Sequence, residues 1–400
     1  MSHRHPRISH TAARPRAATA SAVALGTAAI LCSALVSPVA SAGPGPGTTP
    51  AAAPRGESDP IVIAVEAPLS GSQSANGKDM LRGVTLAVRE VNARGGVLGR
   101  QVSLVPIDDR ADADRAEASV ATAVAAGAVA VIGPYNSSVG VINLSSYMDA
   151  GIVPLRMTSA DQTQGFGATT QPMVKQTSPT EVPYLASLAK ARVTMLVDPS
   201  AYTTSVAQRT AQGLRTRGID VVIISIDADA NDYTAAVSDA LATNPDVIYS
   251  STYYPEGAKI AQALAEANTT AACFMNLANV DTAFVAEAGI PVSRTCTFSG
   301  VPAAEQFPGA QAYVTRYIAA FGKQPDVWGS FTYDSALVLF AAMERAGTTR
   351  YSPLLTAVLG TTGLRGATGT ITINPTSGNR RHAPMFILKV NKSGDFVIGT

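Results

Sequence analysis

The sequence IVIAVEAPLSG at residues 61–71 contains the pattern that decides the fold. Its apolar run at Ile61–Glu66 predicts a buried β-strand, and the small residues of Pro68–Gly71 predict a loop directly after the strand. A helical pattern follows near Asp79–Ala93, and AVAVIGPYNSS at residues 128–138 again joins an apolar strand to a small polar loop. In an open α/β sheet, loops at the carboxyl ends of strands bind ligands. The chain therefore carries candidate binding residues where such a fold can use them.

Residues 1–42 have the pattern of an export signal. Four arginines precede an apolar run from about Ala18 to Val36, and Ala40-Ser41-Ala42 has the small-x-small form that signal peptidase cleaves. A lipid anchor at Cys32 is the alternative, although this cysteine lies inside the apolar run. We expect cleavage after Ala42, a flexible tether at residues 43–60, and a protein that is extracellular or associated with the cell surface.

The charge and hydropathy of the chain exclude two classes of partner. Cleavage would remove four of the 30 basic side chains and none of the 29 acidic ones, so the net charge would change from +1 to −3. Nucleic-acid binding needs a basic face, which such a balance does not supply. Beyond the signal we find no apolar run of about 18 residues. We therefore expect no nucleic acid, a protein peripheral to the membrane at most, and a monomer.

Few residues suited to metal or nucleophilic chemistry follow the signal. His382 is the only histidine beyond it, and Cys273 and Cys296 are the only cysteines. Zinc sites and Ser/His or Cys/His catalysis depend mostly on these residue types. We therefore expect no metal, no cofactor and no enzyme, and we interpret His382 as a solvated loop residue. In an oxidising exterior the two cysteines could form a disulfide, and two buried free thiols are the alternative.

Strand-like runs alternate with helical patterns along most of the chain, which predicts βαβ units and mainly parallel sheets. The number of strands favours two sheets rather than one. We expect an α/β protein with two lobes, each a mainly parallel sheet flanked by helices. The expected bounds are residues 61–176 with 301–360 for lobe 1, and residues 177–300 with 361–400 for lobe 2.

Two punctuated segments, Gln176–Pro179 and Ser299–Pro302, are the expected crossings between the lobes. Near the C-terminus, Gly369–Ile373 and Met385–Val390 are interpreted as a hairpin that gives a third crossing. Lobes joined by several crossings can hinge and close over a ligand.

Five segments carry a family resemblance: Ile61–Gly71, Val91–Gly96, Ile107–Asp109, Val131–Gly133 and Tyr253–Glu256. In this order, between about Asp59 and Val397, they resemble the leucine/isoleucine/valine-binding family of periplasmic-type solute-binding proteins. The resemblance implies the type I periplasmic-binding fold, in which three hinge strands join two α/β lobes around a small molecule. It also implies delivery of that molecule to the permease subunits of an ABC transporter.

The resemblance implies binding positions as well. Asn136-Ser137-Ser138 matches the loop whose serine hydroxyl and amides hold a ligand carboxylate, and Ser159-Ala160-Asp161 matches a second such loop, with Asp161 where threonine is usual. Tyr202 and Tyr253 match the tyrosines with which the other lobe covers the ligand. Asn76 falls near the position of an aromatic residue that packs on the ligand, so that contact is lost or changed.

The main departure from the family pattern is Ala278, which stands where amino-acid binders carry a glutamate for the ligand's ammonium group. A buried ammonium without a partner is costly. Either Asp161, Asp281 or Glu256 replaces the glutamate, or the ligand has no ammonium group. Asp281 and Glu256 also fit structural roles at helix starts.

The other candidates have structural alternatives too. Ser137 and Ser138 could cap a helix expected from about Val139, and the tyrosines could be packing aromatics. The sequence therefore predicts a non-enzymatic solute-binding protein for a small amino-acid-like or related carboxylate or amide ligand. A ligand sensor that signals to a membrane partner, and a binding fold recruited to enzymatic work, are the alternatives.

Overall fold

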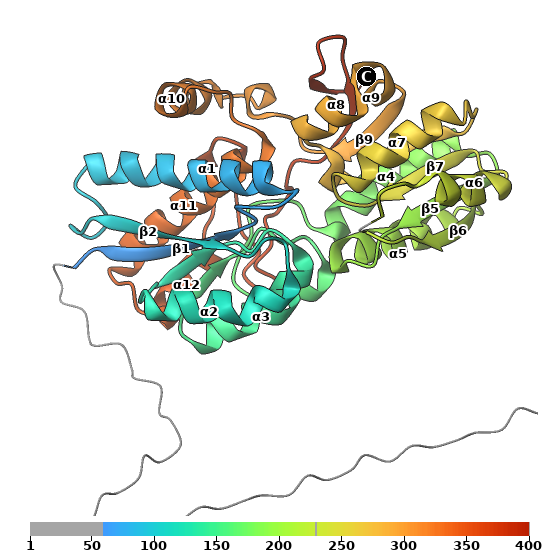
Figure 1. The fold of residues 1–400 in the computed structure, drawn as a ribbon. Helices are drawn as coiled ribbons and strands as arrows, with labels where there is room; N and C mark the ends of the chain where they lie inside the picture. The colour runs from blue at the N-terminus through green and yellow to red at the C-terminus, as the bar shows by residue number, and fades with distance from the viewer. Residues whose placement is uncertain (1–58, 229, 400) are drawn as a thin grey trace, which may run out of the picture. The chain divides into compact units, whose positions relative to one another are not determined.

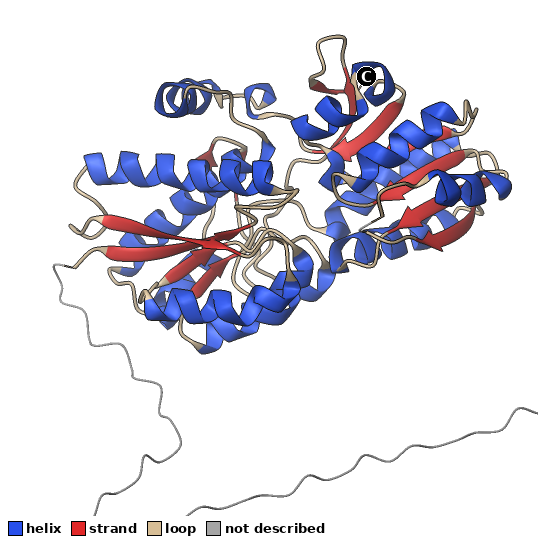
Figure 2. Ribbon diagram, in the orientation of Figure 1, coloured by secondary structure: helices blue, strands red, loops and turns tan. Residues whose placement is uncertain are grey.

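The computed structural model describes residues 59–228 and 230–399. The expected signal peptide, nearly all of the expected tether, and Cys32 lie outside these residues. The described chain is an α/β protein with two main sheets, each with helices packed on its faces (Figures 1 and 2). The predicted fold class is confirmed.

The first sheet has four parallel strands in the order β2-β1-β3-β4. Side chains alternate between its faces along β1: Ile63 belongs to a core cluster shared with α1 and α11, and Ala64 to a cluster shared with α2 and α3. These elements are β1 (Ile61–Ala67), α1 (Ser74–Ala93), β2 (Val102–Asp108), α2 (Ala116–Ala125), β3 (Ala130–Ile132), α3 (Ser137–Asp149), β4 (Val153–Leu155) and α11 (Val327–Ala346).

The second sheet has seven strands in the order β13-β12-β9-β8-β7-β5-β6. Strands β5 to β9 are parallel, and β12 and β13 add antiparallel pairs at one edge. The strands are β5 (Arg192–Val197), β6 (Asp220–Ser225), β7 (Val247–Ser251), β8 (Ala272–Met275), β9 (Cys296–Gly300), β12 (Phe386–Val390) and β13 (Phe396–Ile398).

Helices cover both faces of the second sheet. Met195 of β5 belongs to a cluster with α4 and α5, and its neighbour Leu196 belongs to a cluster with α6, α7 and α8. The helices are α4 (Val174–Leu188), α5 (Ala201–Arg215), α6 (Thr234–Ala242), α7 (Glu256–Glu266), α8 (Thr282–Ala288) and α9 (Ile290–Ser293). The parallel strands β5, β7, β8 and β9 are therefore buried on two sides, which explains their apolar runs, whereas the edge strand β6 exposes Asp220, Ile223 and Ser225.

The C-terminal third returns to the first sheet before it completes the second. Tyr317 of α10 (Gln311–Phe321) and Leu354 of α12 (Tyr351–Leu359) lie in the core cluster of the first sheet. So does Ile371 of β11 (Gly369–Ile371), although the sequence placed residues 361–400 with lobe 2. We call the first sheet with α1–α3, α10–α12 and β10–β11 the first body, and the second sheet with α4–α9 the second body.

The predicted hairpin of Gly369–Ile373 with Met385–Val390 is wrong. Strand β11 pairs with β10 (Leu364–Gly366), and β12 pairs with β9 and β13. Both segments have the apolar pattern of strands, but pattern alone does not identify a strand's partner.

The segment Gln176–Pro179, expected to be an irregular crossing, lies inside α4. This helix accommodates Pro179 and Pro183, and it buries Val182 and Leu185 against the second sheet. The burial of these apolar side chains outweighs the helix-breaking tendency of proline.

Cys273 and Cys296, for which the sequence left both a disulfide and two free thiols open, form a disulfide. The two residues face each other across the parallel strands β8 and β9. Among the described residues, no helix combines the length and the apolar character needed to span a membrane.

Candidate ligand-binding site

A cavity lies between loops that follow the carboxyl ends of strands in both sheets. The unoccupied space at its lining side chains, with its opening to solvent included, is about 240 Å³. The first body contributes Tyr135, Ser137, Met157, Ser159, Gln171 and Trp328, and the second contributes Tyr202, Tyr253, Leu277 and Ala278. Four of the predicted site residues therefore meet here: Ser137, Ser159, Tyr202 and Tyr253.

The loop after β3 reaches the cavity because the chain turns sharply at Gly133. This residue has φ +122°, and a Cβ atom there would lie 2.0 Å from the carbonyl oxygen of Glu66. Only glycine fits such an approach without strain. The turn brings Tyr135 to the cavity and starts α3 at Ser137, with Asn136 in the N-cap position. The helix starts two residues before its predicted position, so Ser137 and Ser138 lie in its first turn.

The Ser137 hydroxyl joins the two predicted carboxylate loops. Its Oγ accepts hydrogen bonds from the backbone N–H groups of Ser159 and Ala160, both at 3.2 Å. These distances are at the long end for an N–H···O bond. Ala160 itself is fully buried and does not line the cavity.

The Ser159 hydroxyl is occupied by protein partners. It donates to the carbonyl oxygen of Pro172 at 2.7 Å and accepts from Nε2 of Gln171 at 3.1 Å. The same Nε2 also donates to the carbonyl oxygen of Met157. Ser159 thus orients Gln171, a residue that the sequence analysis did not single out.

Aromatic rings from both bodies close the cavity. The Tyr253 ring lies edge-on to Tyr135 at 6.2 Å and to Tyr202 at 5.7 Å between centroids, and Tyr135 lies 5.3 Å from Trp328. The Tyr253 hydroxyl also lies near the backbone of Ser137 and the side chain of Asn136. Burial raises the pKa of Tyr253 well above its usual value, so the hydroxyl is neutral. The tyrosine of the second body thereby contacts the start of α3.

No aspartate or glutamate lines the cavity in the described part of the chain. Ala278 lies on its wall, in a short 3₁₀ turn at Leu277–Asn279 that follows β8. Its side chain is buried and carries no charge. The resemblance to amino-acid binders implies a glutamate at this position, and the wall there is instead formed by Leu277 and Ala278 and is apolar.

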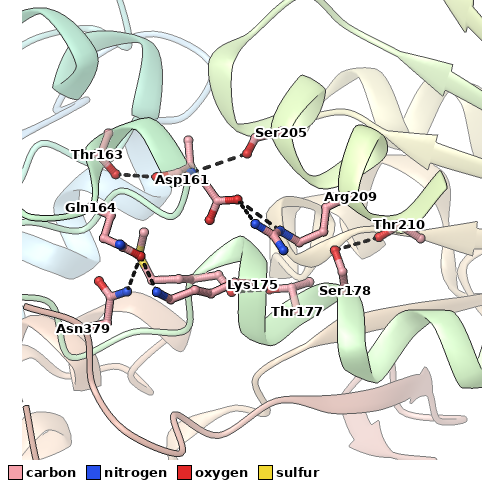
Figure 3. A network of polar contacts seen from close by, with 12 residues as sticks. Asp161, Thr163, Gln164, Lys175, Thr177, Ser178, Ser205, Arg209, Thr210 and Asn379 are labelled. Carbon is pink, nitrogen blue, oxygen red and sulfur yellow. Dashed lines mark hydrogen bonds and ion pairs between the residues drawn. The ribbon is translucent and has the colours of Figure 1, made fainter. Parts of the chain in front are cut away.

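Asp161 lies outside the cavity and forms an ion pair between the two bodies (Figure 3). Its Oδ2 accepts from Nε of Arg209 in α5 at 3.0 Å and from a second guanidinium nitrogen of the same residue. Nearby, the backbone N–H of Ala201 donates to Oγ of Ser138 at 3.0 Å. Asp161 and Ser138 therefore belong to what we call the seam, the contacts between the two bodies outside the cavity.

Asp281 belongs to another part of the seam. It caps α8 by accepting from the N–H of Ala283 at 2.7 Å, and it lies near the side chain of Asn76 of the first body. Burial, together with the nearby carboxyl group of Asp326, raises the pKa of Asp281 to about 7. Thr282 donates to Asp326 across the seam at 2.9 Å. The expected cap is confirmed, and the side chain does not line the cavity.

Glu256 begins α7, in agreement with its expected structural role, and does not line the cavity either. None of the three acids considered as substitutes for the missing glutamate therefore lines the cavity.

Among the described residues, no cluster of histidine, cysteine, aspartate or glutamate is arranged to hold a metal ion.

Tyr135, Met157, Gln171, Leu277 and Trp328 line the cavity but were not among the predicted site residues. Tyr135 had a usable signal, because it lies one residue before Asn136 in the loop after β3. Trp328 and Gln171 had none, because they reach the cavity from segments that do not directly follow a strand of the sheet.

Comparison with known proteins gives one family and a consistent fold. The family model described as "Periplasmic binding protein" matches residues 60–395. The chain is 27% identical over 305 residues to "Leu/Ile/Val-binding protein homolog 2" of Brucella abortus, a match that covers 74% of this chain and 82% of that protein.

Two solved structures show the same fold. One is the branched-chain amino acid transporter substrate binding protein LivJ of Streptococcus pneumoniae in complex with isoleucine. It has a TM-score of 0.74 at 20% sequence identity, and the match covers 85% of this chain and 100% of that chain. A solute-binding protein of an ABC transporter from R. palustris, in complex with benzoate, has a TM-score of 0.75 at 18% identity, over 85% of this chain and 95% of that one.

Proposed function

Because the chain belongs to the periplasmic binding protein family, we propose that it is an exported solute-binding protein that captures a small carboxylate without an ammonium group. The ligand lies in the cavity between the two bodies and passes to the permease subunits of an ABC-type importer. The family is one of binding proteins, which agrees with the expectation that the chain is not an enzyme.

The observation that carries this proposal is the uncharged cavity wall at Ala278. An ammonium group in this cavity would meet no carboxylate from the described residues. The effective penalty for burying one unpaired charge is several kcal/mol. An α-amino acid would bear that penalty, and its deaminated analogue would not.

The start of α3 supplies the positive end that a ligand carboxylate needs. Helix N-termini bind anions through free N–H groups and the helix dipole. The backbone N–H groups of Ser159 and Ala160 both donate to Oγ of Ser137, with N···O distances of 3.2 Å. Because hydrogen bonds to a charged oxygen are shorter and about twice as strong, a carboxylate can replace these long bonds to the hydroxyl.

The rest of the cavity favours an apolar ligand of small size. Tyr135, Trp328 and Met157 line the first-body side, and Tyr202 and Tyr253 line the other. The unoccupied space of about 240 Å³ includes the opening to solvent, so the enclosed part of the cavity is smaller still. The same fold holds isoleucine in one solved relative and benzoate in another, so the residues of the cavity decide the ligand class.

The two bodies correspond to the two lobes that close over the ligand. Seam contacts such as Asp161–Arg209 and Ser138–Ala201 join them in the described structure. A ligand that contacts both Ser137 and Tyr253 stabilises the same arrangement, and closure around it excludes water. Of the nine predicted site residues, this proposal gives direct ligand contacts to Ser137, Tyr202 and Tyr253 and to the backbone of Ser159.

Ligand retained by the purified protein, identified by mass spectrometry, tests the function. The melting temperature with added benzoate or L-isoleucine then tests the ligand class, because a ligand that binds only the folded state raises it. We expect a retained acid without an amino group, and a larger rise with benzoate. A retained α-amino acid, or stabilisation by L-isoleucine alone, would contradict the proposed class.

Transport and sensing share this capture chemistry. A permease that binds the ligand-loaded protein in a pull-down supports transport. Capture of a signalling receptor without any permease would instead support the sensor.

A further inference from the structure

The amide group of Gln171 has a fixed orientation at the cavity. Its Nε2 has two hydrogens, and these are used by the carbonyl oxygen of Met157 and the hydroxyl of Ser159. The Met157 carbonyl accepts only, so the opposite amide orientation would set two acceptors against each other. The side-chain orientation is therefore determined by neighbouring groups.

This orientation leaves Oε1 of Gln171 without a hydrogen bond in the described structure. The residue is 1% exposed and lines the cavity. A buried acceptor without a donor costs about as much as a lost hydrogen bond. Because Gln171 belongs to the cavity wall, we look to a bound ligand for the missing donor.

A second polar atom in the cavity wall is also unpaired. The hydroxyl of Tyr202 lies near the backbone N–H of Leu277 but makes no hydrogen bond with it. Tyr202 is 3% exposed and lines the cavity from the second body. Two residues of the cavity wall, one from each body, thus carry a buried polar atom without a hydrogen bond, and both side chains are neutral.

We propose that Gln171 is a specificity-determining residue that selects acids carrying a hydroxyl group in addition to the carboxylate. The proposal rests on the proposed function, because the ligand carboxylate is held at the start of α3 and at the Ser159 amide. A ligand hydroxyl donates to Oε1 without bringing a charge into the uncharged wall. Amide or ammonium donors are less suitable: an amide adds a second hydrogen to be paired, and an ammonium adds an unpaired charge.

Matched ligands test the proposal on the unaltered protein. The first pair is 3-methylbutanoate and 2-hydroxy-3-methylbutanoate, and the second is benzoate and 4-hydroxybenzoate. Calorimetry should give a dissociation constant at least about tenfold lower for the hydroxylated member of one pair, since the plain acid leaves Oε1 unpaired. Binding of both plain acids as tightly as their hydroxylated partners would overturn the inference and indicate that water satisfies Gln171.

Variants then assign the effect to the residue. Gln171→Met keeps the length of the side chain and removes the acceptor, so the preference for the hydroxylated acid should fall to about onefold. Gln212→Met, at an exposed position on α5, makes the same chemical change away from the cavity and should keep the preference. A preference that persists in Gln171→Met would contradict the proposed role.

The outcomes separate the two proposals. If none of the four acids binds, the proposed function fails. If the acids bind and the hydroxyl has no effect, only the inference about Gln171 fails. If Gln171→Met does not fold, the ligand pairs on the unaltered protein still decide between the outcomes.

Discussion

The cavity and the seam lie side by side between the same two bodies, yet they differ in charge. The described cavity wall has no carboxylate, whereas the seam holds Asp161, Asp281 and Asp326. Each seam acid has a partner: Asp161 pairs with Arg209, Asp281 caps α8, and Asp326 caps α11. The acids of this interface therefore serve closure and helix starts. None of them lines the cavity, where it could pair with a positive charge on a ligand.

The largest expected effect comes from removing this difference with Ala278→Glu. The new carboxylate would face an anionic ligand in a buried site, so affinity for 3-methylbutanoate should fall by about 2–4 kcal/mol. L-Valine, which has the same carbon skeleton and an ammonium group, should become the better ligand. Calorimetry with both compounds measures the change.

Ala278→Gln is the matched control, because it adds the same bulk without a charge. It should weaken both compounds and leave their order unchanged. If Ala278→Glu and Ala278→Gln behave alike, bulk rather than charge determines selectivity at this wall.

The next effect is a dependence of binding on pH that arises in the seam. Asp281 has a pKa raised to about 7 by burial and by Asp326, with Asp79 adding to the repulsion and Asn76 and the N–H of Ala283 opposing it. A carboxyl group with a raised pKa holds its proton more tightly in the folded, closed form. Its contribution to stability is therefore complete below about pH 4 and is lost as the pH rises towards 7. Affinity for 3-methylbutanoate should fall several-fold between pH 6 and pH 8.

Asp281→Asn tests the source of that dependence. Asparagine is an equally good N-cap, so α8 should remain intact while the ionisable group is lost. Titrations at the two pH values should then give nearly equal affinities, and Glu256→Gln, at the start of α7, should keep the dependence of the unaltered protein. An unchanged pH profile in Asp281→Asn would exclude Asp281 as its origin.

The smallest effect should come from the ion pair at the rim of the seam. The side chains of Asp161 and Arg209 are 33% and 44% exposed, and exposed pairs contribute only about 0.2–1 kcal/mol. A double-mutant cycle with Asp161→Ala and Arg209→Ala should give a coupling energy in this range for ligand binding, and it should shrink at high salt. A coupling of several kcal/mol would place Asp161 in the ligand site after all.

The sequence predicted most strands because their apolar runs are buried on two faces, as in β1 and β5. The predicted start of α1, Asp79, lies five residues after the observed start. The helix begins with the small residues Ser74-Ala75-Asn76-Gly77, which have no apolar helical pattern. Packing decides this first turn: a Cβ at Gly77 would lie 2.1 Å from the carbonyl oxygen of Pro68. Patterns of single segments do not contain such contacts.

The site was predicted only in part for the same reason. Ser137 and Tyr253 follow strands directly, which sequence order reveals. Gln171 and Trp328 reach the cavity from a loop and a helix, and the ion-pair partner of Asp161 lies 48 residues away. Partners at such separations are set by tertiary packing, so Asp161 was expected at the ligand and lies in the seam.

Calorimetric comparison of 3-methylbutanoate with L-valine on the unaltered protein tests whether the cavity rejects an ammonium group. The two compounds differ only in that group, for which the described cavity has no carboxylate. The acid without the ammonium should bind at least about tenfold more tightly. Tighter binding of L-valine would contradict this prediction.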